Sequence, residues 1–246
     1  MTLVDSGEPW LGMVPSDWIR TRIRNIVAMS PGYSVAAPLS TEAVTIVPME
    51  CVSETGLLDI SKQQLFEDVQ GGLTLFEPGD VIFAKITPCM ENGKGAVVES
   101  LPTRFAFGST EFHVLRTTHR ADPWFLYYYT YNPVFRAFAA ENMTGAAGQK
   151  RVTSRFLKDT RIFLPPIREQ KRIAAFLSAS CALVDAVSTT TARGAERPGD
   201  SGVLNRQMAA LRGYRASLIH ECVTGQRRIT EADLNRVKAY AQKEVA

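Results

Sequence analysis

Residues 164–193, LPPIREQKRIAAFLSASCALVDAVSTTTAR, divide the chain into two parts. A helix is expected to begin directly after Pro165 and Pro166, because proline ends helices but tolerates their first turn. Glu169 then lies in the first turn, where the helix dipole favours an acid. Apolar or small side chains recur after it at alternating spacings of four and three residues, at Ile173, Leu177, Ser180, Val184, Val187 and Thr191. This heptad pattern predicts a long helix that packs against another helix.

A second helix is expected after residues 194–202, whose glycines and proline predict a loop. Its seam has an arginine, Arg215, at one position and otherwise consists of Leu204, Met208, Leu211 and Leu218. The tail from Thr230 is predicted to be a short helix, because Thr230 and Asp233 stand at capping-box spacing. We therefore expect a helical region over residues 165–228 and a separate tail over residues 229–246.

The first 164 residues are typical of a mixed α/β domain. Short β-branched and aromatic runs, separated by Gly, Pro or Asn, predict strands at 44–47, 80–84, 95–98 and 111–115. An aromatic-rich helix is predicted to begin after Asp122, with Pro123 at its first position, and to break at Asn132–Pro133. The expected fold class is α+β, with a mixed α/β domain at residues 1–164 followed by long helices.

Composition excludes several classes of protein. The 246 residues are 45% hydrophobic and 22% charged, as in ordinary globular proteins. No uninterrupted apolar run approaches the roughly 18 residues of a membrane span, and the N-terminus lacks the basic end and apolar core of a signal peptide. The four cysteines are widely spaced and include no C-x-x-C pair, which argues against a zinc site or a disulfide framework. We expect a cytoplasmic protein with no membrane segment.

Charge is distributed unevenly although the net charge is only +3. Residues 40–80 contain eight acids and one base, whereas residues 149–172 contain eight bases and two acids. A concentrated basic surface is what a polyanion-binding protein needs. An ordinary solvated surface explains the same charges, so other features have to decide between the two.

No residue pattern in the sequence clearly indicates a catalytic site. Asp80, Glu91 and Lys94 resemble the acid-acid-lysine set of metal-dependent nucleases, which remains an alternative function. In that set the second acid and the lysine are two residues apart on one strand, whereas here they are three apart with the turn signal Asn92–Gly93 between them. The three histidines have no partners for nucleophilic catalysis. No catalytic residue and no metal ligand is therefore assigned.

Two polar loops are the strongest candidates for a binding site. They span residues 85–94 and 144–151, and each mixes small residues, amides and bases. Lys and Arg contact phosphates, while Asn, Gln and Arg can read base edges. The candidate DNA-binding residues are Lys85, Thr87, Asn92, Lys94, Gln149, Lys150 and Arg151.

Several motifs, in order along about residues 10–228, resemble the specificity subunit of type I restriction-modification systems. They are WLG (10–12) with VP (14–15) and Trp18, VPME (47–50), GDVIFAKITP (79–88) continuing through ENGKG (91–95), GSTEFHVL (108–115), LPPIREQ (164–170) and LIHECVTG (218–225). The resemblance implies that residues 1–164 are a target recognition domain, which reads half of a bipartite DNA sequence. It also implies that the helices form a coiled-coil spacer that docks methyltransferase subunits.

A complete family member has two recognition domains and two helical regions, whereas this chain has one of each. The resemblance therefore implies a non-catalytic, half-length subunit that pairs as a homodimer. It binds no cofactor itself; the methyltransferase would use S-adenosylmethionine, and a restriction subunit would use ATP and Mg²⁺. The loop at 194–202 departs from the family's more continuous helices. A coiled-coil scaffold that does not bind DNA is a further alternative.

The helical interface is assigned to seven apolar residues, Ile173, Leu177, Val184, Val187, Leu204, Leu211 and Leu218. The seam could pair with a second copy of the chain, or it could pack within the chain on residues 203–223. The heptad pattern does not distinguish these arrangements.

Overall fold

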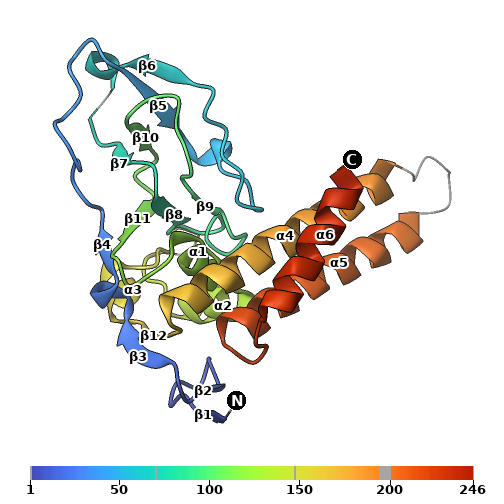
Figure 1. The fold of residues 1–246 in the computed structure, drawn as a ribbon. Coiled ribbons are helices and arrows are strands. Elements are labelled where there is room, and N and C mark those ends of the chain that lie inside the picture. The colour runs from blue at the N-terminus through green and yellow to red at the C-terminus, as the bar shows by residue number, and fades with distance from the viewer. Residues whose placement is uncertain (1, 70, 147, 194–200, 246) are drawn as a thin grey trace. The chain divides into compact units, whose positions relative to one another are not determined.

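The structure, a computed structural model, describes residues 2–69, 71–146, 148–193 and 201–245 (Figure 1). It contains two compact units, the α/β unit Ile19–Leu164 and a helical unit that joins Met1–Trp18 to Pro165–Ala246. The division at residue 164 coincides with the expected boundary. Residues 1–18 and the tail, however, belong to the helical unit, which differs from the expected three-part division.

The N-terminal segment belongs to the helical unit because its apolar residues are buried there. Leu11, Val14 and Trp18 are all buried. Pro15 and Trp18 lie so close to Gly225 that a Cβ on this glycine would collide with both rings. Gly225 also has a positive φ of 74°, which a residue without a side chain adopts readily.

Two four-stranded sheets form most of the α/β unit. The first is antiparallel, in the order β4 (Val27–Met29), β11 (Phe112–Thr117), β8 (Asp80–Ala84) and β9 (Gly95–Val97). The second has the order β6 (Gln63–Leu65), β5 (Ala43–Val47), β10 (Ala106–Gly108) and β7 (Thr74–Phe76), and β5 runs parallel to β10. A separate antiparallel pair joins β3 (Ile19–Arg22) to β12 (Arg161–Leu164). Short 3-10 turns occupy Ile23–Asn25, Met49–Cys51 and Phe66–Asp68.

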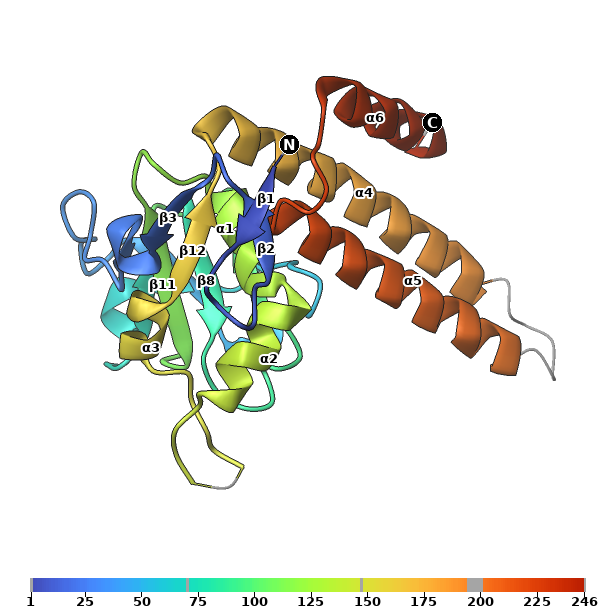
Figure 2. The same cartoon turned by 90° about the horizontal axis from the view of Figure 1, so that it is seen from below.

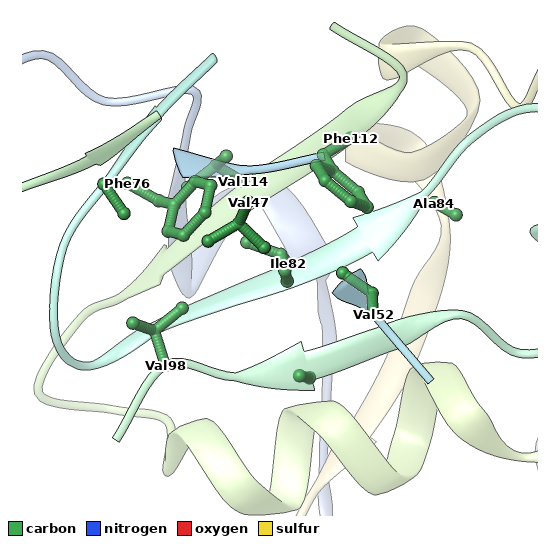
Figure 3. Close-up of a cluster of buried hydrophobic side chains, with 10 residues drawn as sticks. Val47, Val52, Phe76, Ile82, Ala84, Val98, Phe112 and Val114 are labelled. Atoms are coloured by element: carbon green, nitrogen blue, oxygen red, sulfur yellow. The ribbon is translucent and has the colours of Figure 1, made fainter. Parts of the chain in front are cut away.

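The core of this unit lies where the two sheets meet. Figure 3 shows Val47 of β5 and Phe76 of β7 beside Ile82 of β8 and Phe112 of β11, all of which are buried. Every residue of β8 is buried, so this strand is covered on both faces. The loop that follows β8 therefore leaves a fully buried strand.

The predicted helix break is confirmed. α1 (Pro123–Tyr131) begins after Asp122, whose side chain accepts a hydrogen bond from Phe125 N at 3.0 Å. Asn132 ends α1 and caps α2 (Pro133–Glu141) by accepting from Val134 N at 3.1 Å. The short α3 (Ser154–Asp159) follows and leads into β12.

The helical unit contains the long helices predicted from the seam. They are α4 (Ile167–Arg193), α5 (Ser201–Val223) and α6 (Glu231–Val245), preceded in sequence by the hairpin of β1 (Leu3–Asp5) and β2 (Met13–Pro15). Of the expected loop at 194–202, residues 194–200 lie outside the described residues, and α5 already includes 201 and 202. The capping box is confirmed, since Thr230 N donates to Asp233 Oδ2 at 3.0 Å and Asp233 N donates to Thr230 Oγ1 at 3.2 Å.

The helix α4 packs within the chain, against both α5 and α6 (Figure 2). Ile173 and Leu177 are completely covered, and Leu218 of α5 is buried as well. Farther along α4, Val184 is half-buried and Val187 is 48% exposed. Leu204 and Leu211 of α5 are also half-buried. The chain therefore covers the first half of its own seam more completely than the second.

The arginine that interrupts the second seam has a partner on the facing helix. Arg215 is buried, and its Nη1 lies 2.7 Å from Asp185 Oδ1 of α4. The polar pair thus replaces one apolar layer between the helices.

One described helix is long and apolar enough to cross a membrane, over Ile167–Thr189 of α4. Uninterrupted apolar runs did not reveal it, because serines interleave with its apolar residues. Its buried residues, among them Phe176 and Leu177, pack as those of a core helix do.

Candidate nucleic-acid interface

The structure brings the two predicted polar loops together. Residues 85–94 leave the end of β8, and residues 144–151 form a hairpin between α2 and α3 (Figure 2). Thr87 N donates to Lys150 O at 3.0 Å, and Ile86 pairs with Arg151 as an antiparallel bridge. Segments about sixty residues apart in sequence therefore form one surface, which spacing alone did not predict.

The first loop is a compact turn with a buried anchor. Met90 is fully buried, and Asn92 N donates to Pro88 O at 2.9 Å. At Gly93, with φ of 84°, a Cβ would collide with the Arg136 guanidinium. That guanidinium lies 4.8 Å from the centre of the Tyr131 ring and donates to Glu91 O at 3.2 Å. The exposed side chain of Asn92 is thus presented on a well-supported backbone.

The second loop is a hairpin closed by Thr144 and Arg151. Thr144 N donates to Arg151 O at 3.0 Å, and Arg151 N donates to Thr144 O at 2.8 Å. Gly145 has a φ of 127°, and a Cβ there would lie 2.7 Å from Gln149 O, so this position requires glycine. Gln149 and Lys150 are exposed just before the closing residue Arg151.

Three of the seven predicted DNA-binding residues make contacts within the protein. Lys94 Nζ donates to Met49 O at 3.0 Å. The Thr87 hydroxyl donates to Gly148 O at 3.2 Å and so ties the two loops together. Arg151 is engaged on both sides of its guanidinium, as described next. Lys85 is half-buried, and Asn92, Gln149 and Lys150 are the exposed members of the set.

Arg151 forms a two-pronged ion pair with Glu111, beside the start of β11. Its Nε and Nη2 lie 3.0 Å and 2.7 Å from the carboxylate oxygens. Its Nη1 donates to Gln149 O at 3.1 Å. The hydrogen bonds from Arg151 hold the pKa of Glu111 below its usual range, so the carboxylate stays ionised. Arg151 therefore holds the hairpin to the sheet.

His113 on β11 holds the chain directly after the hairpin through a hydrogen bond to Val152. It is buried on β11, and its Nε2 lies 2.8 Å from Val152 O, a carbonyl oxygen that can only accept. Burial lowers the pKa of His113 to about 4, so the ring is neutral near pH 7 and donates from Nε2. The histidine is a structural strand residue.

The nuclease alternative based on Asp80, Glu91 and Lys94 is wrong. Asp80 begins β8, whereas Glu91 and Lys94 follow its far end, about 13 Å away at about 3.3 Å per residue. The Asp80 carboxylate is also occupied, since it accepts from Arg116 Nε at 2.7 Å and from Glu77 N at 2.9 Å. Within the described residues, no three His, Cys, Asp or Glu side chains are grouped as a metal site.

Glu111 and Arg136 also support the site, although their neighbours in sequence do not indicate this. Each acts on a loop distant in sequence, and neither lies in a motif that signals the contact. Only the pairing of β11 with β8 brings Glu111 near the loop after β8.

We expect Arg151→Met to loosen the hairpin without unfolding the unit. Arg151 is 39% exposed, so solvent screens this ion pair and the expected effect is a modest increase in local opening of the hairpin. Hydrogen exchange of the amides of Thr144, Arg151 and Val152 measures this opening. The neighbouring Lys150→Met is the matched control and leaves exchange unchanged; equal exchange in both variants would exclude the supporting role of Arg151.

Comparisons with known proteins agree with this architecture. The family model described as "Type I restriction modification DNA specificity domain" matches residues 67–191. The chain is 33% identical to the type I restriction enzyme EcoAI specificity subunit of Escherichia coli, over 65% of this chain and 27% of that one. It is 31% identical to the EcoEI specificity subunit of the same organism, over 70% of this chain and 29% of that one. This chain thus spans under a third of the length of these relatives.

A solved structure has a similar fold. It is the HsdS subunit from Thermoanaerobacter tengcongensis, with a TM-score of 0.58 and 22% identity. The match covers 73% of this chain and 46% of that one. At this level of identity the similarity concerns the fold alone, and it agrees with the predicted mixed α/β domain and long helices.

Proposed function

The chain belongs to the family of type I restriction-modification DNA specificity domains, and from this we propose that it is the sequence-recognition component of a DNA-methylating complex. The observation that carries the proposal is the hydrogen bonding that joins two polar loops into one surface, where Asn92, Gln149 and Lys150 are exposed. A surface held this firmly meets a duplex with little loss of loop entropy on binding.

The side chains of this surface suit two different tasks. Lys150 and the half-buried Lys85 would neutralise phosphates and set affinity. The carboxamides of Asn92 and Gln149 can each donate to and accept from an adenine edge in the major groove. One such two-bonded contact gives about 1–3 kcal/mol of discrimination against the wrong base. No step of this function requires the chain to break or form a covalent bond.

The partners we propose follow from this role. They are double-stranded DNA, a methyltransferase subunit that carries S-adenosylmethionine, and a restriction subunit that uses ATP and Mg²⁺, all in the cytoplasm. The chain itself would hold no cofactor. The incompletely covered half of the α4–α5 pair, with Val187 at 48% exposure, is a suitable surface for a second copy, and two copies would read a symmetric, gapped target.

The test is to co-express the chain with the methyltransferase and map methylated sites by sequencing. We expect one gapped motif, and we expect Gln149→Ala to relax one position of it by about tenfold, the equivalent of about 1.4 kcal/mol. Gln63→Ala, an exposed glutamine on β6, is the matched control and leaves the motif unchanged. Methylation that is the same with and without the chain would refute the proposal and favour a scaffold that does not bind DNA.

A further inference from the structure

A second basic surface lies in the α/β unit, outside the two polar loops. It is built from residues 19–26, which include β3, and residues 153–164, which include α3 and β12. These two segments contain one acid, Asp159, and six bases: Arg20, Arg22, Arg24, Arg155, Lys158 and Arg161. Their formal charge is therefore 6 − 1 = +5, larger than that of the whole chain. We call this set of six bases the basic patch.

The fold creates this concentration of charge. β3 and β12 pair antiparallel, although they lie about 140 residues apart, and α3 contacts the 3-10 turn after β3. In the strand register Arg22 stands directly opposite Arg161. Like charges directly opposite each other on paired strands destabilise a sheet.

The single acid does not neutralise the patch. Asp159 Oδ1 lies 2.7 Å from Arg24 Nη1 and 3.7 Å from Arg22 Nη1, so two arginines share one carboxylate. Arg20, Arg155, Lys158 and Arg161 are exposed. The charges of Arg155 and Lys158 on α3 therefore face solvent.

One segment of the patch follows the candidate interface directly in sequence. Only Val152 and Thr153 separate the hairpin 144–151 from α3, and the six residues of α3 span about 9 Å at about 1.5 Å per residue. Residues of α3 therefore lie close to the hairpin along the chain, where a duplex bound at the two loops could also meet them. In protein–DNA complexes, contacts with phosphates position the protein while contacts with bases specify the sequence.

We propose that the basic patch binds the phosphate backbone of the duplex beside the bases that the two loops read. The inference rests on the proposed function and adds to it the surface that sets affinity and orientation. Its chemistry is electrostatic and independent of base sequence. Removing bases of the patch should therefore lower the affinity for DNA without changing the discrimination between DNA sequences.

The test compares Arg155→Gln/Lys158→Gln with the wild type, each co-purified with the methyltransferase. The probes are a duplex carrying the mapped motif and a scrambled duplex of equal length. Because this variant removes two cations that neutralise phosphates, the slope of log K against log salt should fall by about 1.8 and affinity at low salt by more than about tenfold. Both duplexes should lose affinity equally, so discrimination between them should not change.

Two matched variants keep the test decisive. Lys62→Gln/Lys238→Gln removes the same charge from exposed positions elsewhere and should leave the slope unchanged. Arg155→Lys/Lys158→Arg keeps the charge and should retain the wild-type slope. An unchanged slope in Arg155→Gln/Lys158→Gln would overturn the inference, as would loss of co-purification with unchanged DNA affinity, which would identify a protein-docking surface. Failure of the wild type to bind either duplex would instead refute the proposed function.

Discussion

Replacing Asp80 by alanine is expected to lower the free energy of unfolding of the α/β unit by about 3–5 kcal/mol. Asp80 is fully buried at the start of β8 and accepts from Arg116 Nε at 2.7 Å and Arg116 Nη2 at 2.8 Å. It also accepts from the buried Glu77 N at 2.9 Å. Alanine would leave these donors without the carboxylate. Because Glu77 Oε2 stays 3.2 Å from Arg116, we expect the lower end of this range.

Urea unfolding followed by circular dichroism measures this loss. Asp159→Ala is the control, because Asp159 also pairs with arginine but is 44% exposed, and the expected change is within about 1 kcal/mol. Asp80→Asn keeps the shape and one acceptor oxygen, and should fall between the two. Equal stability of Asp80→Ala and Asp159→Ala would show that the buried network does not hold this sheet edge.

Helix boundaries could be predicted from the sequence because their causes are local. Pro123, Pro133 and the Pro165–Pro166 pair each lack the amide hydrogen that a helix interior needs. Asp122 and Asn132 supply cap acceptors within three residues of their donors. No distant segment alters such contacts, so the breaks appear in the fold where the sequence places them.

The candidate site was predicted only in part, because its geometry depends on strand register. Arg116 faces Asp80 because β11 pairs with β8 in one register, and nothing near Asp80 in the sequence indicates this partner. The sequence around an aspartate does not show whether its carboxylate will bind a metal ion or pair with an arginine. The same limit explains why Arg151 was assigned to DNA, although in the free chain it pairs with Glu111.

The partner of the heptad seam is a further feature that the sequence could not predict. The spacing of the seam identifies an apolar face but not the helix that covers it. Here α4 contacts α5 and α6 of the same chain, Ile173 and Leu177 are buried, and Val187 is 48% exposed. Packing within the chain therefore accounts for the buried part of the seam, and pairing with a second copy remains a proposal for the more exposed part.

The difference in burial between Leu177 and Val187 predicts opposite outcomes for substitutions at these two positions of α4. Leu177→Glu places a carboxylate at a fully buried position and leaves apolar neighbours unpacked, so we expect a loss of about 4 kcal/mol or more and melting of the helical unit. Val187→Glu lies on the incompletely covered half, so it should keep the helical circular dichroism and the melting temperature within a few degrees. In sedimentation it should shift the homodimer toward the monomer. If Leu177→Glu stayed folded and merely dissociated, the seam would be covered by a second copy along its whole length, and the packing within the chain would not be what stabilises it.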